Sequence, residues 1–347
     1  MKELQNQQGS AGAEFSEAGT PSSFGNDQEA IAAATSGVAL YHSPEGLLQL
    51  RGADRQRFLH NQTTNDINRL QPGQGCDTVF VTSTGRTLEL ATAYVTQDAI
   101  LLLVSPQRQQ PLMEWMDRYI FPFDKVELSN LADAQVIFRV IGPQSRQLGE
   151  KIGVEVLTQP GDHVLSQLGE ASVRIALGSG LALPGYTLIS PAEQAASVWS
   201  ELISLNAVPL GDRVWEQLRV QQGRPAPGQE LTEDYNPLEA GLWSAISFEK
   251  GCYIGQETIA RLNTYKGVKQ RLWGVQLEAP VQPGPILAEG KKIGELTSCI
   301  ATAGGASGLA YVRSQVGDAG LEVWVQETPG KLVSVPFLSH EYYQPQK

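Results

Sequence analysis

The stretch Lys250–Arg261 reads KGCYIGQETIAR and is the most informative part of this 347-residue chain. Two glycines flank a Cys-Tyr pair, and the residues after the second glycine are compatible with a helix. A cysteine just ahead of a helix N-terminus, with Lys250 beside it and Arg261 within reach, is expected to form a stabilised thiolate. Gly251 and Gly255 permit a positive φ or a close backbone approach. A buried, inert cysteine is the alternative, but Lys, Gly, Gln and Glu seldom form a core.

The segments before this stretch predict strands and helices in alternation. Short strands are expected at 39–41 and 46–50, followed by a helix that Asp54 caps. The polar residues 61–66 form either a capped turn or the lining of a pocket. Residues 112–120 carry apolar side chains at helical spacing and are expected to contact the core.

The second half of the chain changes character twice. Residues 134–207 alternate strand and helix, as in a ferredoxin-like insert, and Ser190-Pro191-Ala192-Glu193 carries the signals of a helix start. Residues 211–221 are expected to form an amphipathic helix that ends at Gly223. From Gln270 onward, short strands separated by Gly/Pro turns predict a small antiparallel barrel.

Composition and charge exclude several classes of function. The formal net charge of −11 argues against nucleic acid as the principal partner, because a phosphate-tracking surface needs clustered Lys and Arg. No segment approaches eighteen apolar residues, so no membrane-spanning helix is expected. The histidines show no metal-ligand spacing, and no metal site is predicted. The odd number of cysteines, without a CxxC pair, fits a reducing cytoplasm: Cys76, Cys252 and Cys299.

The first 36 residues are rich in Gly, Ser, Gln, Ala and Glu. They lack the basic start and apolar run of a secretory signal, and they contain acids but no Arg, unlike a transit peptide. A disordered leader is therefore expected.

The segment KGCYIGQE resembles the signature of the YgfZ-type branch of the folate-binding GcvT superfamily. Other segments agree with landmarks of that family, and the resemblance covers residues 47–337. The run 249–273 is most similar to cyanobacterial and plastid members. The agreeing segments are LRVQQG at 218–223, NPLEA at 236–240, Leu59-x-x-Gln62-x-Thr64-Asn65-Asp66, and Gly85-Arg86.

The resemblance implies a fold of the α+β class, a three-lobed ring around a central folate channel. It implies a folate-binding domain at 37–133 and 208–267, a ferredoxin-like insert at 134–207 and a C-terminal β-barrel at 268–347, after the leader at 1–36. Family members support iron–sulfur cluster assembly or repair in a tetrahydrofolate-dependent way, with the signature cysteine essential.

Carried onto this chain, the resemblance makes Cys252 the functional thiol. The signature loop is completed by Lys250, Gly251, Tyr253, Gly255, Gln256 and Glu257. Tyr253 then offers a stacking face or a hydroxyl at the channel mouth, or simply packs. Arg261 pairs with a folate carboxylate or forms a structural salt bridge. The candidate folate-binding residues are Asn65, Asp66, Glu89, Gln221, Tyr253 and Arg261.

Two departures separate the chain from the glycine-cleavage aminomethyltransferases. Those enzymes carry an Asp pair after a Gly-Gly hairpin, where this chain has GRTLEL at 85–90 and keeps at most Glu89. They also have Glu where Gln221 stands here. An amide offers one acceptor and one donor instead of two acceptors. Against two pterin N–H groups, one contact becomes donor against donor, at a cost on the order of 1–3 kcal/mol if buried.

The sequence therefore predicts a tetrahydrofolate-binding accessory factor for iron–sulfur proteins that acts through Cys252. Its expected partners are a folate-type small molecule and iron–sulfur client or assembly proteins. One alternative is a folate-dependent aminomethyltransferase or demethylase, which leaves open whether the protein is an enzyme. The other is a scaffold that has kept the fold and lost folate.

Overall fold

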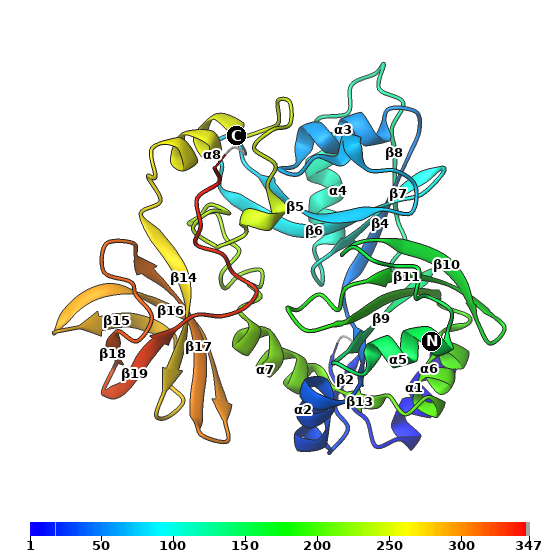
Figure 1. Cartoon of the computed structure of the whole chain (residues 1–347). Coiled ribbons are helices and arrows are strands. Elements are labelled where there is room, and N and C mark those ends of the chain that lie inside the picture. Colours follow the sequence, from blue (N-terminus) through cyan, green and yellow to red (C-terminus); the bar gives the residue numbers. More distant parts are fainter. Residues whose placement is uncertain (18, 345–347) are drawn as a thin grey trace. The chain divides into compact units, whose positions relative to one another are not determined.

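The computed structural model describes residues 1–17 and 19–344 (Figure 1). The chain divides into two units. Unit 1 comprises Met1–Gln56, Arg69–Cys76 and Thr92–Glu216, and unit 2 comprises Arg57–Asn68, Asp77–Ala91 and the chain from Gln217 onward. The elements α3 (Arg55–Gln62), β5 (Gly75–Val81), β6 (Thr87–Val95) and α7 (Asp212–Gln222) each run from one unit into the other.

Unit 1 is built on a six-stranded sheet of order β10-β11-β12-β9-β3-β13. Its strands pair antiparallel except β13 with β3, which are parallel. They are β3 (Ala39–Ser43), β9 (Gln135–Ile141), β10 (His163–Leu168), β11 (Ala171–Leu177), β12 (Gly185–Pro191) and β13 (Val208–Leu210). The helices of this unit are α1 (Lys2–Ser10), α2 (Asp27–Ser36), α4 (Gln109–Asp117), α5 (Ser145–Lys151) and α6 (Ala195–Ser204).

A five-stranded sheet of order β5-β6-β7-β4-β8 is formed by the strands that lie between β3 and β9 in the chain. Besides β5 and β6 it contains β4 (Gly46–Arg51), β7 (Ala99–Val104) and β8 (Glu127–Asn130). β7 is buried along its whole length, as its continuous apolar sequence AILLLV requires. The predicted strands at 39–41 and 46–50, the helix after Asp54 and the core contacts Leu112 and Met116 of α4 are all confirmed.

The expected disordered leader is corrected by the structure. Residues 2–10 and 27–36 form α1 and α2, and a two-stranded ribbon joins β1 (Glu14–Phe15) to β2 (Pro21–Ser23). Leu4 and Phe24 belong to the buried core of unit 1, with 1% and 8% of their surface exposed. The composition is polar, but a few apolar side chains at the right places are enough to dock the segment.

The helix start expected at Ser190 is also wrong. β12 continues through Pro191, which pairs with Gln135, and α6 begins only at Ala195. The Ser190 hydroxyl donates to the carbonyl of Pro191 instead of capping a helix. The tertiary pairing of β12 with β9 outweighs the local capping signal.

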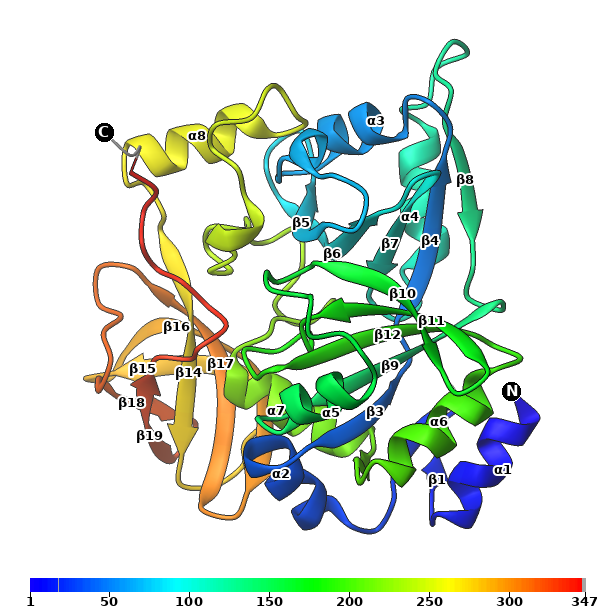
Figure 2. The ribbon, with the colours of Figure 1, turned by 45° about the vertical axis from the view of Figure 1, so that its right-hand side comes forward.

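Unit 2 contains a closed barrel of order β14-β17-β16-β15-β18-β19, which confirms the predicted C-terminal barrel (Figure 2). Its strands are β14 (Gln270–Leu277), β15 (Gly284–Ala288), β16 (Lys291–Thr302), β17 (Gly305–Arg313), β18 (Glu322–Val325) and β19 (Thr328–Val333). The remaining elements are α8 (Gln256–Thr264) and the short helices η1 (Ile67–Arg69) and η2 (Trp243–Ala245).

The chain after the barrel returns to α8, and its last described residues lie beside that helix in both views (Figures 1 and 2). The amide of Asn263 donates to the carbonyl of Tyr343 and accepts from its N–H. The Tyr343 ring stacks on Phe248, and its hydroxyl donates to Glu249 at 2.5 Å. The C-terminal segment therefore fixes both α8 and the residues that lead into the signature loop.

Candidate functional site around Cys252

The signature loop, residues 250–255, lies between an irregular segment and the start of α8. Gly255 caps α8 with a φ of 79°. A Cβ at this position would come within 2.6 Å of the Thr82 carbonyl oxygen and 3.0 Å of the Gly85 Cα. Only glycine permits this approach, so the hairpin at Gly85 and the first turn of α8 fix each other.

Cys252 is exposed to solvent. The sulfur is therefore not the buried, inert kind that a lone cysteine often is. Cys76 and Cys299 are only partly exposed, and Cys299 packs against the barrel core. Of the three thiols, the signature cysteine is the most exposed to a substrate or protein partner.

Lys250 is buried, and its ammonium group is enclosed by backbone oxygens. Nζ donates to the carbonyls of His60 (2.5 Å), Thr63 (2.7 Å) and Asn65 (2.7 Å). These three bonds use the ammonium's three donors and anchor the loop, while an effect of Lys250 on the thiolate remains a prediction. The loop is held a second time, since the N–H of Ile254 donates to the carbonyl of Asn61 at 3.1 Å.

Tyr253 is buried, with 8% of its surface exposed. Its ring lies 4.8 Å from the Lys250 ammonium, a cation–π contact. Burial raises the pKa of its hydroxyl. These contacts favour the packing role of Tyr253 over a stacking face turned to a ligand.

His60 lies next to the signature loop, near Gly251, and is not one of the predicted site residues. The side chain is buried, with 6% of the residue's surface exposed, and its Nδ1 lies 3.2 Å from Oδ1 of Asp66. Burial, and then the charge of Lys250, lower the pKa of the imidazole, while Asp66 opposes them. The sequence signal was slight: a histidine inside the Leu59–Asp66 landmark, with no mark that it reaches the signature loop.

Asn65 and Asp66 are both engaged in structural contacts. The Asn65 amide donates to the carbonyl of Asp77 at 2.7 Å, and its oxygen accepts the N–H of Asp66. The Asp66 carboxylate faces His60. Their direct binding of folate remains a prediction, and the polar stretch 61–66 serves in the structure as a capped turn that anchors Lys250.

Thr87, Glu89 and Gln221 offer polar groups in unit 2. Thr87 and Glu89 are two residues apart on β6, so their side chains leave the same face of the strand. Glu89 is fully buried, and the Thr87 hydroxyl is buried without a hydrogen-bond partner among the described residues. Gln221, near the end of α7, is half-buried. The binding of folate by Glu89 and Gln221 remains a prediction.

Gln256, Glu257 and Arg261 lie on α8. The Gln256 amide donates to the carbonyl of Gly251 at 3.3 Å and ties the helix to the loop. Glu257 and Arg261 are exposed, and the described chain gives Arg261 no salt bridge. Arg261 is thus open to an anionic partner. All six candidate folate-binding residues fall in unit 2.

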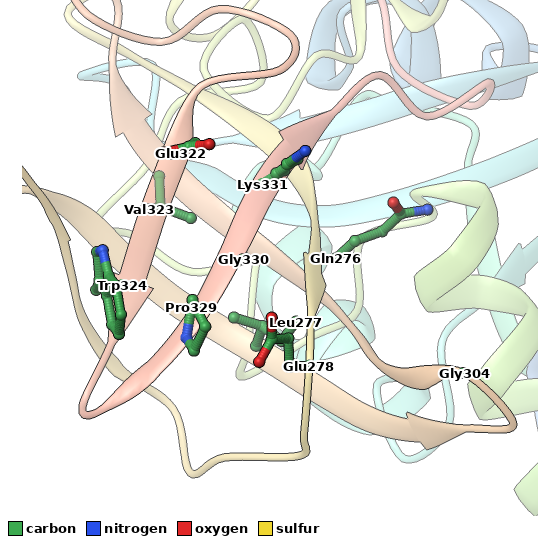
Figure 3. A pocket seen from close by; sticks show the side chains of 10 residues that line it. All are labelled: Gln276, Leu277, Glu278, Gly304, Glu322, Val323, Trp324, Pro329, Gly330 and Lys331. Carbon is green, nitrogen blue, oxygen red and sulfur yellow. The ribbon is translucent and has the colours of Figure 1, made fainter.

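Three cavities in the described part of the chain are lined by other residues. The largest, of about 640 Å³, lies in unit 1 between residues 145–160 and 177–186. The barrel holds one of about 340 Å³, where Trp324 of β18 and Pro329 of β19 stand on neighbouring strands (Figure 3). A third, of about 260 Å³, is lined by Trp273, His340 and their neighbours. None of these three contains a residue of the signature loop.

No helix among the described residues is long and apolar enough to cross a membrane. No cluster of three or more His, Cys, Asp or Glu side chains in the same residues has the geometry to hold a metal ion.

Comparison with known proteins identifies relatives along most of the chain. The family model for the GCVT N-terminal domain matches residues 1–250. A protein of Arabidopsis thaliana, provisionally named a chloroplastic transferase, is 43% identical over 339 residues, which cover 96% of this chain and 78% of the relative. An aminomethyltransferase of Rubrobacter xylanophilus is 28% identical over 320 residues, covering 87% of this chain and 83% of the relative.

A solved structure shows the same fold. The glycine cleavage system aminomethyltransferase T of Bartonella henselae superposes with a TM-score of 0.83 over 99% of both chains, at 19% sequence identity. The predicted α+β fold with a C-terminal barrel is therefore confirmed.

Proposed function

Because the chain belongs to the GCVT family, we propose that it is a tetrahydrofolate-binding accessory factor in the assembly or repair of iron–sulfur proteins. In this proposal Cys252 is the working group. The cysteine acts on client proteins, either through removal of an adduct by one-carbon transfer to folate or through transient thiolate ligation of iron.

The observation that carries the proposal is the geometry of the signature loop. A thiol is exposed on a segment that buried contacts hold on both sides, with Lys250 before it and Tyr253 after it. A cysteine that only packs in a core does not need such contacts on both sides of an exposed loop. An exposed thiol on a fixed loop is an arrangement suited to contact with a second molecule.

The folate part of the proposal is supported by the polar groups of unit 2. Thr87 and Glu89 supply a hydroxyl and a carboxylate on one strand face, and Gln221 supplies an amide. Arg261 is available to a carboxylate at the other end of the ligand. Bound tetrahydrofolate would supply one-carbon chemistry, and these residues would hold and orient it.

The test is complementation of a strain that lacks its own homologue, with the activity of iron–sulfur enzymes as the readout. The wild-type chain is expected to restore activity, and Cys252→Ala is not. Cys299→Ala is the matched control and should rescue like the wild type. Equal rescue by Cys252→Ala and the wild type removes the thiol from the mechanism.

A second candidate is a folate-dependent aminomethyltransferase or demethylase, favoured by full-length relatives that bear the name aminomethyltransferase. It predicts methylene-tetrahydrofolate formation from a methylamine donor. The absence of the Asp pair after the hairpin at Gly85 argues against turnover. Sustained turnover by the purified protein would replace the first proposal with this one.

A scaffold without folate is the third candidate. Titration with tetrahydrofolate, followed by the fluorescence of the six tryptophans, distinguishes it from the others. The proposal includes a reducing compartment, which for a bacterial protein is the cytoplasm; the name of the Arabidopsis relative places that protein in the chloroplast.

A further inference from the structure

The largest of the three cavities lies within unit 1 and is lined by none of the candidate site residues. Its volume of about 640 Å³ is that of a site for a small organic molecule. The walls come from the start of α5, from the residues that precede β10 and from the turn between β11 and β12. The cavity is therefore formed within one compact unit of the chain.

The wall between β11 and β12 is held by its own hydrogen bonds. The hydroxyl of Ser179, which is fully buried, donates to the carbonyl of Leu183 at 2.6 Å and accepts the N–H of Leu181 at 3.2 Å. The N–H of Gly178 donates to the carbonyl of Gly185 at 2.9 Å. Leu181 and Leu183 thus line the cavity from a turn of fixed shape.

The wall that precedes β10, residues 155–160, is fixed in a similar way. The carboxylate of Asp162 accepts the N–H of Gln159 at 2.9 Å. The N–H of Gly161 donates to the carbonyl of Leu177 at 2.9 Å and joins this wall to β11. Because both walls are held by contacts within the chain, the cavity is formed in advance, and a ligand pays little for ordering it.

Two buried hydroxyl groups line the cavity without a hydrogen-bond partner in the described chain. They belong to Ser145, the first residue of α5, and to Tyr186 of β12, with 2% and 5% of their surface exposed. Neither oxygen is fully enclosed by protein, so both stay accessible. The Tyr186 hydroxyl lies against Gly149 of α5, where a Cβ would overlap it. Since buried polar groups are nearly always paired, these hydroxyls indicate a polar partner that enters the cavity.

The groups around the two hydroxyls favour an anionic partner. Burial raises the pKa of Tyr186, so its hydroxyl keeps the proton at neutral pH and can donate it. Arg146 lines the cavity next to Ser145, and its ion pair with Glu150, at 3.8 Å between exposed side chains, is weak enough to be exchanged for a ligand. Glu155, the acid among the lining residues, is exposed and can remain in solvent.

We propose that this cavity binds a small organic acid with an apolar body. The carboxylate of the acid accepts hydrogen bonds from the hydroxyls of Ser145 and Tyr186 and pairs with the guanidinium of Arg146. Its apolar body packs against the leucine and proline side chains of the lining: Leu157, Pro160, Leu177, Leu181, Leu183 and Pro184. The site goes beyond the proposed function, because all six candidate folate-binding residues fall in unit 2.

Titration calorimetry of the full-length protein with 4-phenylbutyrate, and with the uncharged 4-phenylbutanol, tests the proposal. The acid should bind about tenfold more tightly than the alcohol, because it alone offers a carboxylate to the three donors. Tyr186→Phe keeps the ring and should weaken binding of the acid about tenfold. Ser145→Ala should act in the same direction. Ala182→Trp places a large side chain at the exposed edge of the cavity and should abolish binding of both probes.

The matched control is Tyr265→Phe, at an exposed tyrosine of unit 2, which should leave the affinity unchanged. Because the Tyr186 hydroxyl has no partner in the described chain, Tyr186→Phe should fold like the wild type. Equal affinity of the wild type and Tyr186→Phe for the acid overturns the proposal, as does unchanged binding by Ala182→Trp. Absence of binding at millimolar concentrations overturns it too and leaves the hydroxyls to water.

Saturating tetrahydrofolate separates this site from the proposed folate site. The affinity for 4-phenylbutyrate should be the same with and without it. Displacement of the acid by tetrahydrofolate would contradict a separate site and would support the folate part of the proposed function. Failure of the acid to bind at all would leave the complementation assay of Cys252 unaffected.

Discussion

The ammonium of Lys250 lies 4.8 Å from the centre of the Tyr253 ring. These two residues stand on either side of Gly251 and Cys252, and both are buried, whereas the residues between them are exposed. The signature loop therefore exposes its thiol between two buried residues that are joined by a cation–π contact. Its fixed position follows from the two flanking side chains and not from contacts of the cysteine.

Replacement of Lys250 by Met should destabilise unit 2. The substitution keeps much of the stem's volume but leaves three backbone carbonyls without their donor, at a cost of about 2–4 kcal/mol. Urea unfolding of the two proteins measures this difference. The exposed Lys291→Met serves as the control and should change the free energy of unfolding by less than about 0.5 kcal/mol. Equal effects of the two substitutions would show that the enclosed ammonium contributes nothing.

Tyr253→Phe should preserve stability, because the ring keeps its packing and its contact with Lys250. Tyr253→Leu removes the ring face and should cost about 1–3 kcal/mol. Complementation by Tyr253→Phe should match the wild type if packing is the role of this residue. A folded Tyr253→Phe protein that fails to complement would restore the alternative in which the hydroxyl faces the ligand.

The buried pair of Arg219 and Glu230 joins α7 to the barrel. Arg219 Nη1 lies 3.1 Å from Glu230 Oε2, and the hydroxyls of Thr297 and Ser298 donate to Oε1 at 2.6 Å each. Glu230→Gln leaves the guanidinium buried without its charge partner and should cost about 3–5 kcal/mol. Thermal unfolding measures the loss, with the exposed Glu233→Gln as control. Similar melting temperatures for both variants would contradict this account of the motif LRVQQG.

Stability should fall as the pH is lowered from about 6.5 to about 4, in part through His42. Burial lowers the pKa of His42 from 6.5 to about 4, so the folded chain keeps it neutral while the unfolded chain takes up a proton. The full difference corresponds to about 3 kcal/mol. In His42→Leu the free energy of unfolding should depend less on pH in this window. Parallel curves for the two proteins would show that His42 titrates alike in both states.

The N-terminal segment offers a direct test of its packing. Leu4 is 1% exposed within the core of unit 1, so Leu4→Ala should cost about 2–4 kcal/mol. The neighbouring Glu3→Ala removes an exposed side chain and should have little effect. A disordered leader would make the two substitutions equally harmless in urea unfolding.

The fold was predictable where local pattern and tertiary context agree. The strand pattern after Gln270 anticipated the barrel, and the helical spacing of Leu112 and Met116 anticipated α4. The failures lie where tertiary contacts outweigh composition. A polar leader is docked by Leu4, and a capping signal at Ser190 gives way to strand pairing. The predicted boundaries of the three domains and the ring around a central channel stay predictions.

The candidate site was predictable from the signature only as a set of residues. The cysteine could be identified by motif, and its exposure agrees with that assignment. The direction of the Lys250 side chain could not be predicted. Its place in the sequence puts it beside the thiol, but its ammonium binds three carbonyls that are remote in the sequence. His60 could not be linked to Gly251 from the sequence, because the two residues are far apart along the chain. Only the fold brings them together.

The claim that most of this account depends on is that the sulfur of Cys252 faces the place where a folate-type ligand binds. The direct measurement is the alkylation rate of each cysteine with and without saturating tetrahydrofolate, resolved by peptide. The account predicts that the ligand slows alkylation of Cys252 and leaves Cys76 and Cys299, the internal references, unchanged. Alkylation of Cys252 at the same rate in the fully bound protein would contradict it.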